Sequence, residues 1–464
     1  MALTDTVPAA APPAHEGILR RQSLRESAAR TYARSLPIVP VRARGLTIEG
    51  ADGRRYLDCL SGAGTLALGH NHPVVLEAIR TVLDSGAPLH ILDLATPVKD
   101  AFTTELFATL PGKLAEKARI QFCGPAGTDA VEAAFTLVRM ATGQDGLLAF
   151  SGAYHGMTAD ALAASGGARH NGVTRLPYPY DYRCPFGTGG GRGAELAARW
   201  TENLLDDEKS GVPRPAGMIV EPVQGEGGVI PAPDGWLRRM REITTGRRIP
   251  LIVDEVQTGV GRTGTFWAVE HSGIVPDVLV LSKAIGGSLP LAVIVYREEL
   301  DTWQPGAHAG TFRGNQLAMA AGRATLAYVR ENGLARRAGE LGARMLARLS
   351  GLAASYDCIG DVRGRGLMLG LELVDREAAT DATGAHPPAP ALAAAVQRAC
   401  LDRGLIVELG GRHAAVVRLL PPLTITDEQA DAVLDRLADA IAAAIRTTPR
   451  PTGAAPTTMR GTTP

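Results

Sequence analysis

An apolar run closes on a single lysine at Asp277-Val278-Leu279-Val280-Leu281-Ser282-Lys283, and Gly286-Gly287 follows soon after. A short apolar run between polar residues is typical of a buried strand. An ammonium group at the end of such a strand is costly unless it is paired or used, because desolvation disfavours its charged form. Desolvation also makes an amine a nucleophile for carbonyl chemistry. The alternative is a lysine with a buried stem whose head reaches solvent.

The bulk composition is that of a globular protein without a large net charge. The chain has 464 residues, 45% of them hydrophobic and 21% charged, with a formal net charge of +0. Nothing in this balance recruits nucleic acid or an anionic membrane. The five cysteines are scattered without a CxxC pair, which argues against structural zinc or disulfides and indicates a reducing compartment. The N-terminus has no signal-peptide pattern and no apolar run reaches the ~18 residues of a membrane span, so we expect a cytoplasmic protein.

Short apolar strands alternate with helices on both sides of Lys283. Strands are expected at residues 119–123, 147–150, 217–220, 249–253, 278–281 and 291–296, and a helix at residues 127–141. The last strand is close enough to its predecessor to pair with it antiparallel. The alternation predicts an α/β fold: a mostly parallel sheet with helices on both faces, in three layers. Functional residues then gather beyond the carboxyl ends of the strands.

The domain organisation follows from changes of pattern along the chain. We expect a disordered Ala/Pro-rich tail at 1–22, a first segment of a small domain at 23–70, and a large domain at 71–320. A second α+β segment of the small domain follows at 321–446, and a disordered Pro/Thr-rich tail at 447–464. Residues 38–58 alternate in short stretches and predict an antiparallel meander.

Two motifs after the first strands could hold a planar phosphorylated ligand. Gly127 and Thr128 begin the helix at 127–141, where free amides and a hydroxyl form an anion site; the alternative is an ordinary helix cap. Tyr154 and His155 follow the strand at 147–150, where an aromatic ring could stack on another planar ring. The alternative for Tyr154 is a tyrosine in a turn.

An acidic residue ends the strand at 249–253. Asp254 follows apolar residues, and a buried carboxylate needs a cationic partner. The pyridinium nitrogen of pyridoxal phosphate would supply one. Gln257, three residues later, could donate to a ring oxygen. The alternative is an Asp254–Lys283 pair between neighbouring strands.

Two further sites complete the set. Thr311 lies in the polar turn Gly310-Thr311-Phe312-Arg313-Gly314-Asn315, another possible phosphate contact. Arg418 lies between apolar neighbours and suits bidentate carboxylate binding, with Glu226 as a candidate internal partner. A structural Arg–Glu bridge is the alternative, and both could hold at different stages of a cycle. A lysine, an acid, a Gly-Thr site and an aromatic at successive strand ends together fit one cofactor, pyridoxal 5'-phosphate.

At these residues the sequence resembles the class III (omega-amino acid) aminotransferases of fold type I, from about Leu24 to Ile445. The motifs that carry the resemblance are Gly69-His70-Asn71-His72-Pro73, Gly127-Thr128-Asp129-Ala130-Val131-Glu132, Tyr154-His155-Gly156, the stretches 221–228 and 254–262, Ser282-Lys283 and the Thr311 turn.

The resemblance implies a role for each candidate around the cofactor. Lys283 would form the Schiff base and then shuttle a proton, and Asp254 would hold the protonated ring nitrogen. Gln257 would bond the ring hydroxyl, with Tyr154 stacked on the ring and His155 beside it.

The remaining roles concern the phosphate and the acceptor. Gly127 and Thr128 would bind the phosphate together with Thr311 of a partner subunit, which implies a homodimer with shared sites. Arg418 would hold the α-carboxylate of 2-oxoglutarate, and Glu226 would mask that arginine during the donor half-reaction.

Within the family, the stretches 281–291 and 310–316 look most like those of the enzymes that exchange amino groups between diaminobutyrate and 2-oxoglutarate. This implies transfer of the 4-amino group of L-2,4-diaminobutyrate, giving aspartate 4-semialdehyde and glutamate. Ser61-Gly62-Ala63-Gly64-Thr65 has only small residues where the ornithine branch places an aromatic, so donor recognition is unexplained. The alternatives are another omega-amine donor (ornithine, acetylornithine, 4-aminobutyrate or lysine), an aminomutase or racemase, and a non-catalytic binding protein.

Overall fold

A seven-stranded sheet forms the centre of the larger part of the molecule. The computed structural model describes residues 15–167 and 172–447. The strand order is β4 (Ala118–Phe122), β12 (Val293–Arg297), β11 (Val278–Leu281), β10 (Leu251–Asp254), β7 (Gly217–Val220), β5 (Leu147–Phe150) and β6 (Val173–Leu176). Only β12 runs antiparallel to its neighbours, as expected for its pairing with β11. The predicted mostly parallel sheet is therefore confirmed.

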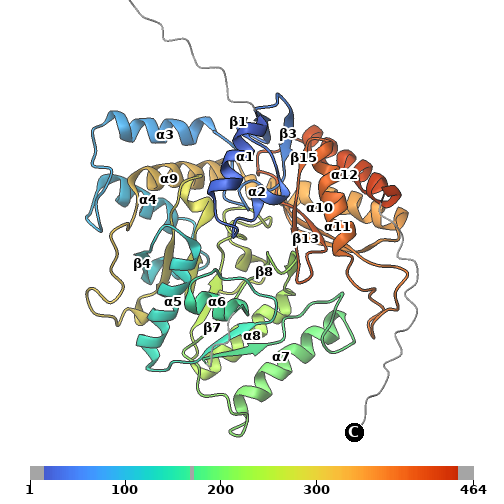
Figure 1. Ribbon diagram of the computed structural model, residues 1–464. Coiled ribbons are helices and arrows are strands. Elements are labelled where there is room, and N and C mark those ends of the chain that lie inside the picture. Colours follow the sequence, from blue (N-terminus) through green and yellow to red (C-terminus); the bar gives the residue numbers. More distant parts are fainter. Residues whose placement is uncertain (1–14, 168–171, 448–464) are drawn as a thin grey trace, which may run out of the picture.

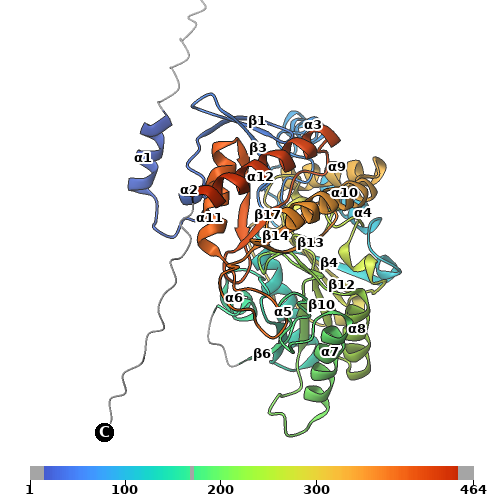
Figure 2. The same cartoon turned by 90° about the vertical axis from the view of Figure 1, so that its right-hand side faces the viewer.

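Alternate residues of each central strand pack against opposite helical layers. Ile252 joins a cluster with α5 (Gly127–Thr142) and α6 (Ala159–Ser165). Val253 joins the other cluster, with α8 (Asp234–Arg247) and α7 (Gly190–Asp206). Figure 2 shows the two pairs of helices on either side of the strands. A sheet buried on both faces explains why its strands are continuous apolar runs.

Early and late described segments of the chain lie together in a second part of the molecule (Figure 1). The meander of β1 (Pro40–Arg44), β2 (Thr47–Gly50) and β3 (Arg55–Asp58) is antiparallel, as expected, and β15 (Leu405–Ile406) adds to β3 in parallel. A four-stranded antiparallel sheet has the order β13 (Ile359–Arg365), β14 (Met368–Leu373), β17 (Val416–Leu419), β16 (Glu408–Gly410). Its helices are α10 (Leu334–Ser355), α11 (Pro390–Asp402) and α12 (Asp427–Thr447). This pairing supports a small domain built from both ends, although the boundaries at 70 and 320 stay predictions.

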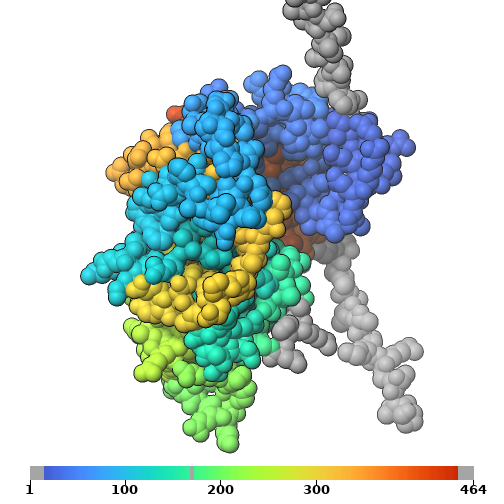
Figure 3. Space-filling view, turned by 90° about the vertical axis from the view of Figure 1, so that its left-hand side faces the viewer, coloured from blue at the N-terminus to red at the C-terminus, as the bar shows by residue number. Residues whose placement is uncertain are grey.

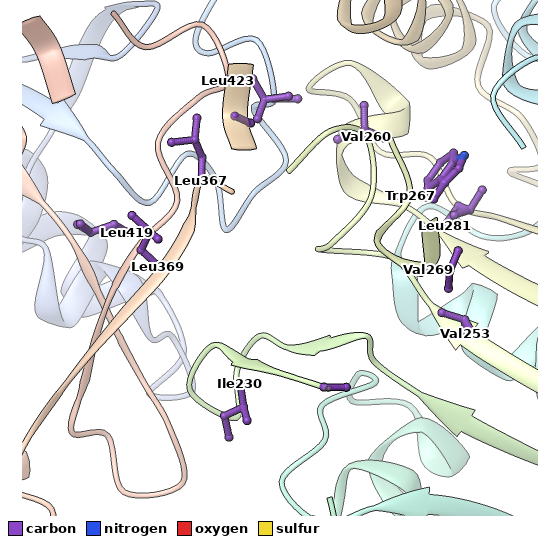
Figure 4. Packing of buried hydrophobic residues seen from close by; sticks show 14 of the residues in the cluster. Ile230, Val253, Val260, Trp267, Val269, Leu281, Leu367, Leu369, Leu419 and Leu423 are labelled. Atoms are coloured by element: carbon purple, nitrogen blue, oxygen red, sulfur yellow. The ribbon is translucent and has the colours of Figure 1, made fainter. Parts of the chain in front are cut away.

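One continuous hydrophobic cluster joins the two parts. Figure 4 shows Leu369 and Leu419 of the antiparallel sheet, with Leu367 from the turn before β14, on one side, and Trp267 and Leu281 of the larger part on the other. Three further helices complete the larger part: α3 (Pro73–Asp84), α4 (Pro97–Phe107) and α9 (Gln316–Glu331). A short hairpin of β8 (Val223–Gln224) and β9 (Ile230–Pro231) lies between the parts. The two parts thus bury apolar surface against each other and hold a site between them in place.

The N-terminal segment differs from the expectation of disorder at 1–22. Residues 15–22 belong to α1 (His15–Arg25), which buries none of its residues, and a single turn, α2 (Tyr32–Ser35), follows. Figure 2 shows α1 standing apart from the rest of the chain. The Ala/Pro-rich composition ends at Ala14, and the helix formers that follow explain the difference. Residues 1–14 and 448–464 lie outside the described residues.

The fold bears on the state of the cysteines and on the possibility of a membrane-spanning helix. All five cysteines are free and buried. Among the described residues, no helix combines the length and apolar character that a membrane crossing requires.

Candidate active site

A cavity of about 260 Å³ lies beyond the carboxyl ends of β5, β7, β10 and β11. Eight of the ten residues expected to form the site line it: Gly127, Thr128, Tyr154, His155, Glu226, Asp254, Gln257 and Lys283. Arg418 is connected to it through Glu226, whereas Thr311 lies elsewhere. The strands converge at one sheet edge, which brings residues 156 positions apart in sequence together.

Lys283 is held at the cavity by a strained turn. Ser282 separates β11 from the short 3-10 helix Lys283–Gly286, which Lys283 begins, and the Lys283 φ of 52° is left-handed, which is uncommon for a residue with a side chain. The Ser282 hydroxyl donates to the Leu291 carbonyl at 2.8 Å and fixes the start of this turn. Burial lowers the pKa of Lys283, against the pull of the Glu226 carboxylate. The side chain is half-buried and lines the cavity, where its amine is available to a bound ligand.

Asp254 pairs with His155 rather than with Lys283. Its Oδ2 lies 2.8 Å from His155 Nδ1, and its Oδ1 accepts a hydrogen bond from the Val256 amide at 3.0 Å. Burial alone would lower the pKa of His155, but the bond to Asp254 and its charge outweigh burial and raise that pKa. No ion pair within 4.0 Å joins Asp254 to Lys283 in the described part of the chain. The alternative of an Asp254–Lys283 pair is therefore not realised, and the carboxylate is oriented toward the cavity by its neighbour.

The first turn of α5 forms an anion cradle. The Thr128 hydroxyl lies 2.5 Å from the Thr158 hydroxyl and accepts a hydrogen bond from the Thr158 amide at 3.1 Å. A Cβ on Gly127 would meet Val256 at 3.1 Å, and a Cβ on Gly156 would meet the Thr128 hydroxyl at 2.3 Å. Gly156 has a φ of 123° and no room for a Cβ, so this position needs glycine, while Gly127 leaves the backbone open at the start of the 16-residue helix α5.

Gln257 connects the cavity to the small-residue stretch 61–65. Its Nε2 donates to the Ala63 carbonyl at 3.0 Å, while its Oε1 is buried without a partner among the described residues. Four successive residues of that stretch, 61–64, have left-handed backbone, including Ser61 and Ala63. The small side chains are thus explained in part by backbone geometry, and the free amide oxygen can accept a hydroxyl donor.

Arg418 is ion-paired with two carboxylates. Its Nη2 donates to Glu226 Oε1 at 2.8 Å and also forms an ion pair with Glu408. Burial alone would lower the pKa of Arg418, but the two carboxylates raise it. The expected pair with Glu226 is present, and Glu408 is an addition that sequence reasoning missed. A charged residue within the apolar run Ile406-Val407-Glu408-Leu409 was the available signal.

Glu221 was also missed. It directly follows β7, and its carboxylate accepts hydrogen bonds from the Tyr154 amide at 3.0 Å and the Gly225 amide at 3.1 Å. Burial raises the pKa of Glu221 to about 7. It orients the backbone of Tyr154, whose half-exposed ring lines the cavity. Its position at a strand end was the same signal that identified Asp254.

Thr311 is exposed and lies in a second cavity of about 300 Å³. The lining includes Leu89, Leu92 and the turn from Thr311 to Asn315. Figure 3 shows this face of the molecule, where the yellow-orange segment near residue 310 crosses beside the blue segment that precedes α4. The chain therefore does not bring its own Thr311 to the Lys283 cavity.

The residues present fit pyridoxal 5'-phosphate. The α5 cradle suits the phosphate, the Asp254 carboxylate suits a protonated ring nitrogen, and the Lys283 amine suits the aldehyde. The unpartnered Oε1 of Gln257 suits the ring hydroxyl. A donor set of this kind, with unsatisfied buried polar atoms, is one that a ligand completes.

Comparisons with known proteins agree with this geometry. The model of the family "Aminotransferase class-III" matches residues 28–441. The chain is 55% identical to a diaminobutyrate–2-oxoglutarate aminotransferase of Rhizobium meliloti over 430 residues, which covers 91% of this chain and 92% of that protein. It is 48% identical to the enzyme of the same name from Haemophilus influenzae over 440 residues, 93% of this chain and 96% of that protein.

Solved structures agree as well. An amine transaminase from an uncultivated Pseudomonas species, crystallised in its PLP-bound form, superposes with a TM-score of 0.78 at 29% identity, covering 90% of this chain and 98% of that one. These findings confirm the resemblance, the fold class and the enzyme class expected from the motifs. The chain belongs to the class III aminotransferase family.

Proposed function

We propose that this aminotransferase exchanges the 4-amino group of L-2,4-diaminobutyrate with 2-oxoglutarate, giving aspartate 4-semialdehyde and glutamate. The observation that carries the proposal is the Glu226–Arg418 pair beside Lys283, because it provides a carboxylate site that can be covered and uncovered. The names of the relatives at 55% and 48% identity support diaminobutyrate as the donor.

Lys283 and the Asp254–His155 pair carry the proton chemistry. Pyridoxal 5'-phosphate, when bound, supplies the electrophilic carbon and the electron sink. Burial lowers the pKa of Lys283 and so favours its neutral amine, the form that can take a proton from the substrate carbon and return it nearby. Asp254, oriented by His155, would hold the protonated ring nitrogen of the bound cofactor.

Arg418 and Glu226 separate the two half-reactions. With Glu226 in place, the guanidinium is neutralised and an amine donor without an α-carboxylate at its reacting carbon can enter. With Glu226 turned away, Arg418 stays paired with Glu408, and its unpartnered Nε and Nη1 can donate to the α-carboxylate of 2-oxoglutarate. An aminomutase needs no second substrate, so a coverable arginine argues against that alternative.

We also propose a homodimer with shared sites in the cytoplasm. Thr311 lies outside its own chain's active-site cavity, on a face with exposed Leu89, Leu92 and Phe312. An apolar exposed cluster of this kind is typical of an interaction surface. The five free cysteines fit a reducing compartment.

A panel of amine donors with 2-oxoglutarate tests the function. We expect diaminobutyrate to give the highest kcat/KM, with glutamate formed in equal amount to the semialdehyde, ahead of ornithine, acetylornithine, 4-aminobutyrate and lysine. A better donor elsewhere in the panel would contradict the donor assignment. Absence of glutamate with every donor would favour the mutase.

The Lys283→Ala variant tests the site itself. We expect it to lose turnover and the visible absorbance of the lysine-bound cofactor, because no other amine lines the cavity in the described residues. Lys113→Ala, outside the cavity lining, is the matched control and should retain both. Turnover in the Lys283→Ala variant would sink the assignment.

A further inference from the structure

Glu408 is a buried carboxylate that the proposed reaction does not use. In the antiparallel pair of β16 and β17 it lies directly opposite Arg418, to which it is ion-paired. Its second oxygen, Oε1, accepts a hydrogen bond from the Tyr32 hydroxyl at 3.0 Å. Strand register and two partners therefore hold this carboxylate in one position.

The two carboxylates on Arg418 differ in their freedom to move. Glu226 lies in the 225–229 loop between β8 and β9, and 32% of its side chain is exposed. Glu408 lies inside a sheet, and only 9% of its side chain is exposed. Glu226 can turn toward solvent when an acceptor arrives, whereas Glu408 stays.

The charges of this cluster do not balance when the donor binds. One guanidinium faces two carboxyl groups, and burial and the charge of Glu226 raise the pKa of Glu408 against the pull of Arg418, so a second negative charge is unfavourable here as long as Glu226 is in place. The guanidinium is fully buried, and its Nε and Nη1 have no hydrogen-bond partner among the described residues. A buried excess charge is costly, and a cation placed beside it would offset the cost.

The cluster lies beside the active-site cavity. Glu226 lines that cavity, and the carboxylates Glu226 and Glu408 both act on the charge of Lys283. Burial raises the pKa of Tyr32, with Glu408 as the next cause and Glu226 after it. Burial also raises the pKa of Tyr154, and there Glu226 is the next cause. Glu226 and Tyr154 line the cavity, and Glu408 is connected to Glu226 through their shared partner Arg418.

We propose that Glu408, held by Arg418 and Tyr32, binds the second ammonium group of a diamino acid donor while the first amine reacts at Lys283. The inference rests on the proposed function and names the group that recognises its donor. It also accounts for the small residues at 61–65, because recognition by a charge on β16 needs no aromatic ring there.

Two donors of equal length show whether Glu408 binds the second ammonium group or only supports the site in general. L-2,4-diaminobutyrate and 4-aminobutyrate share the reacting amine and the carboxylate, and differ by the α-ammonium group. In the Glu408→Gln variant we expect kcat/KM for diaminobutyrate to fall roughly 10- to 100-fold, the range for losing one charged hydrogen bond. We expect kcat/KM for 4-aminobutyrate to change by about threefold or less, because that donor has no group for Glu408 to bind.

Two further variants complete the test. The selectivity is the ratio of kcat/KM for diaminobutyrate to kcat/KM for 4-aminobutyrate. Tyr32→Phe removes one hydrogen bond to Glu408 and should lower this ratio by a smaller factor than Glu408→Gln does. Glu377→Gln, the same exchange at an exposed site between β14 and α11, should leave the ratio unchanged. If the Glu408→Gln variant does not fold or does not bind the cofactor, the ratio of kcat/KM for the two donors is measured in Tyr32→Phe instead, and an unchanged ratio there would overturn the proposal.

An equal loss on both donors would overturn the proposal and leave Glu408 a support for Arg418. An unchanged ratio would overturn it as well. The donor panel on the unaltered enzyme tests the proposed function separately: if ornithine is the donor, the pair ornithine and 5-aminopentanoate replaces the two donors in the same comparison.

Discussion

Glu255, next to Asp254, is a buried carboxyl that serves structure rather than chemistry. Its Oε1 accepts a hydrogen bond from the Val269 amide at 2.9 Å, and its Oε2 accepts one from the Thr258 hydroxyl at 2.5 Å. The side chain is buried, and burial raises its pKa to about 7. At mildly acidic pH the folded protein therefore holds a proton here that the unfolded chain has released.

This proton makes stability depend on pH. Between the ordinary carboxyl pKa of 4.5 and about 7, the folded state binds more protons than the unfolded state, so stability falls as pH rises through this window. Glu255→Gln removes the titration and keeps an acceptor for the Val269 amide. We expect the Tm of the variant to rise relative to the unaltered protein between pH 5 and pH 8, by an amount equivalent to at most about 3 kcal/mol.

Thermal denaturation of both proteins across this pH range measures the effect. Glu299→Gln, at an exposed position, should follow the unaltered protein at every pH. A constant Tm difference between Glu255→Gln and the unaltered protein would mean that Glu255 has an ordinary pKa.

At the scale of elements, α9 is the support on which the Lys283 turn rests. A Cβ on Gly322 of α9 would meet the Ile285 carbonyl oxygen at 1.9 Å, and a Cβ on Gly287 would meet the Ala321 backbone at 2.4 Å. Helix and turn are thus in backbone contact, which is possible only with glycine on both sides. The helix holds the strained backbone of Lys283 from behind.

Two glycine-to-alanine exchanges in helices should have opposite effects. Gly322→Ala forces α9 away from the Lys283 turn and should lower stability by roughly 1–3 kcal/mol, with weaker cofactor retention. Gly351→Ala lies in α10 with nothing within 4 Å and should raise stability by about 0.5–1 kcal/mol. Thermal denaturation together with visible absorbance checks both. Shifts of the same sign would contradict the contact between α9 and the turn.

At the scale of the whole molecule, the position of Thr311 predicts how sites are shared. If each site takes its lysine from one chain and Thr311 from the other, two inactive variants complement each other. Mixing Lys283→Ala with Thr311→Arg as refolded or co-expressed chains should restore about a quarter of the full activity, because half of random dimers are mixed and each mixed dimer has one intact site.

Each variant alone is the control and should be inactive or nearly so. A second control mixes unaltered chains with chains that carry both exchanges. Each mixed dimer then contains one intact chain but no intact site. No recovery in the first mixture would place Thr311 in its own chain's site or outside any site.

Local pattern was enough for the elements that carry the chemistry. The helix expected at 127–141 is α5 (Gly127–Thr142), and the strands that end at Asp254 and before Lys283 are β10 and β11. Apolar runs, helix-start residues and strand-end polar residues are properties of neighbours in the chain, and parallel strands bring their carboxyl ends to one edge. For that reason eight of ten expected residues share a cavity without any knowledge of tertiary contacts.

Tertiary packing alone decided the rest. Arg418 faces Glu408 because β16 and β17 pair in one register, and Tyr32 reaches Glu408 across 376 residues of chain. Tertiary packing also decided three other features: the pairing of Asp254 with His155, the left-handed backbone of Lys283, and the pairing of β15 with β3. Each depends on how distant segments fit together, since register and burial are set by the packing of the whole core and are not written in any local run of residues.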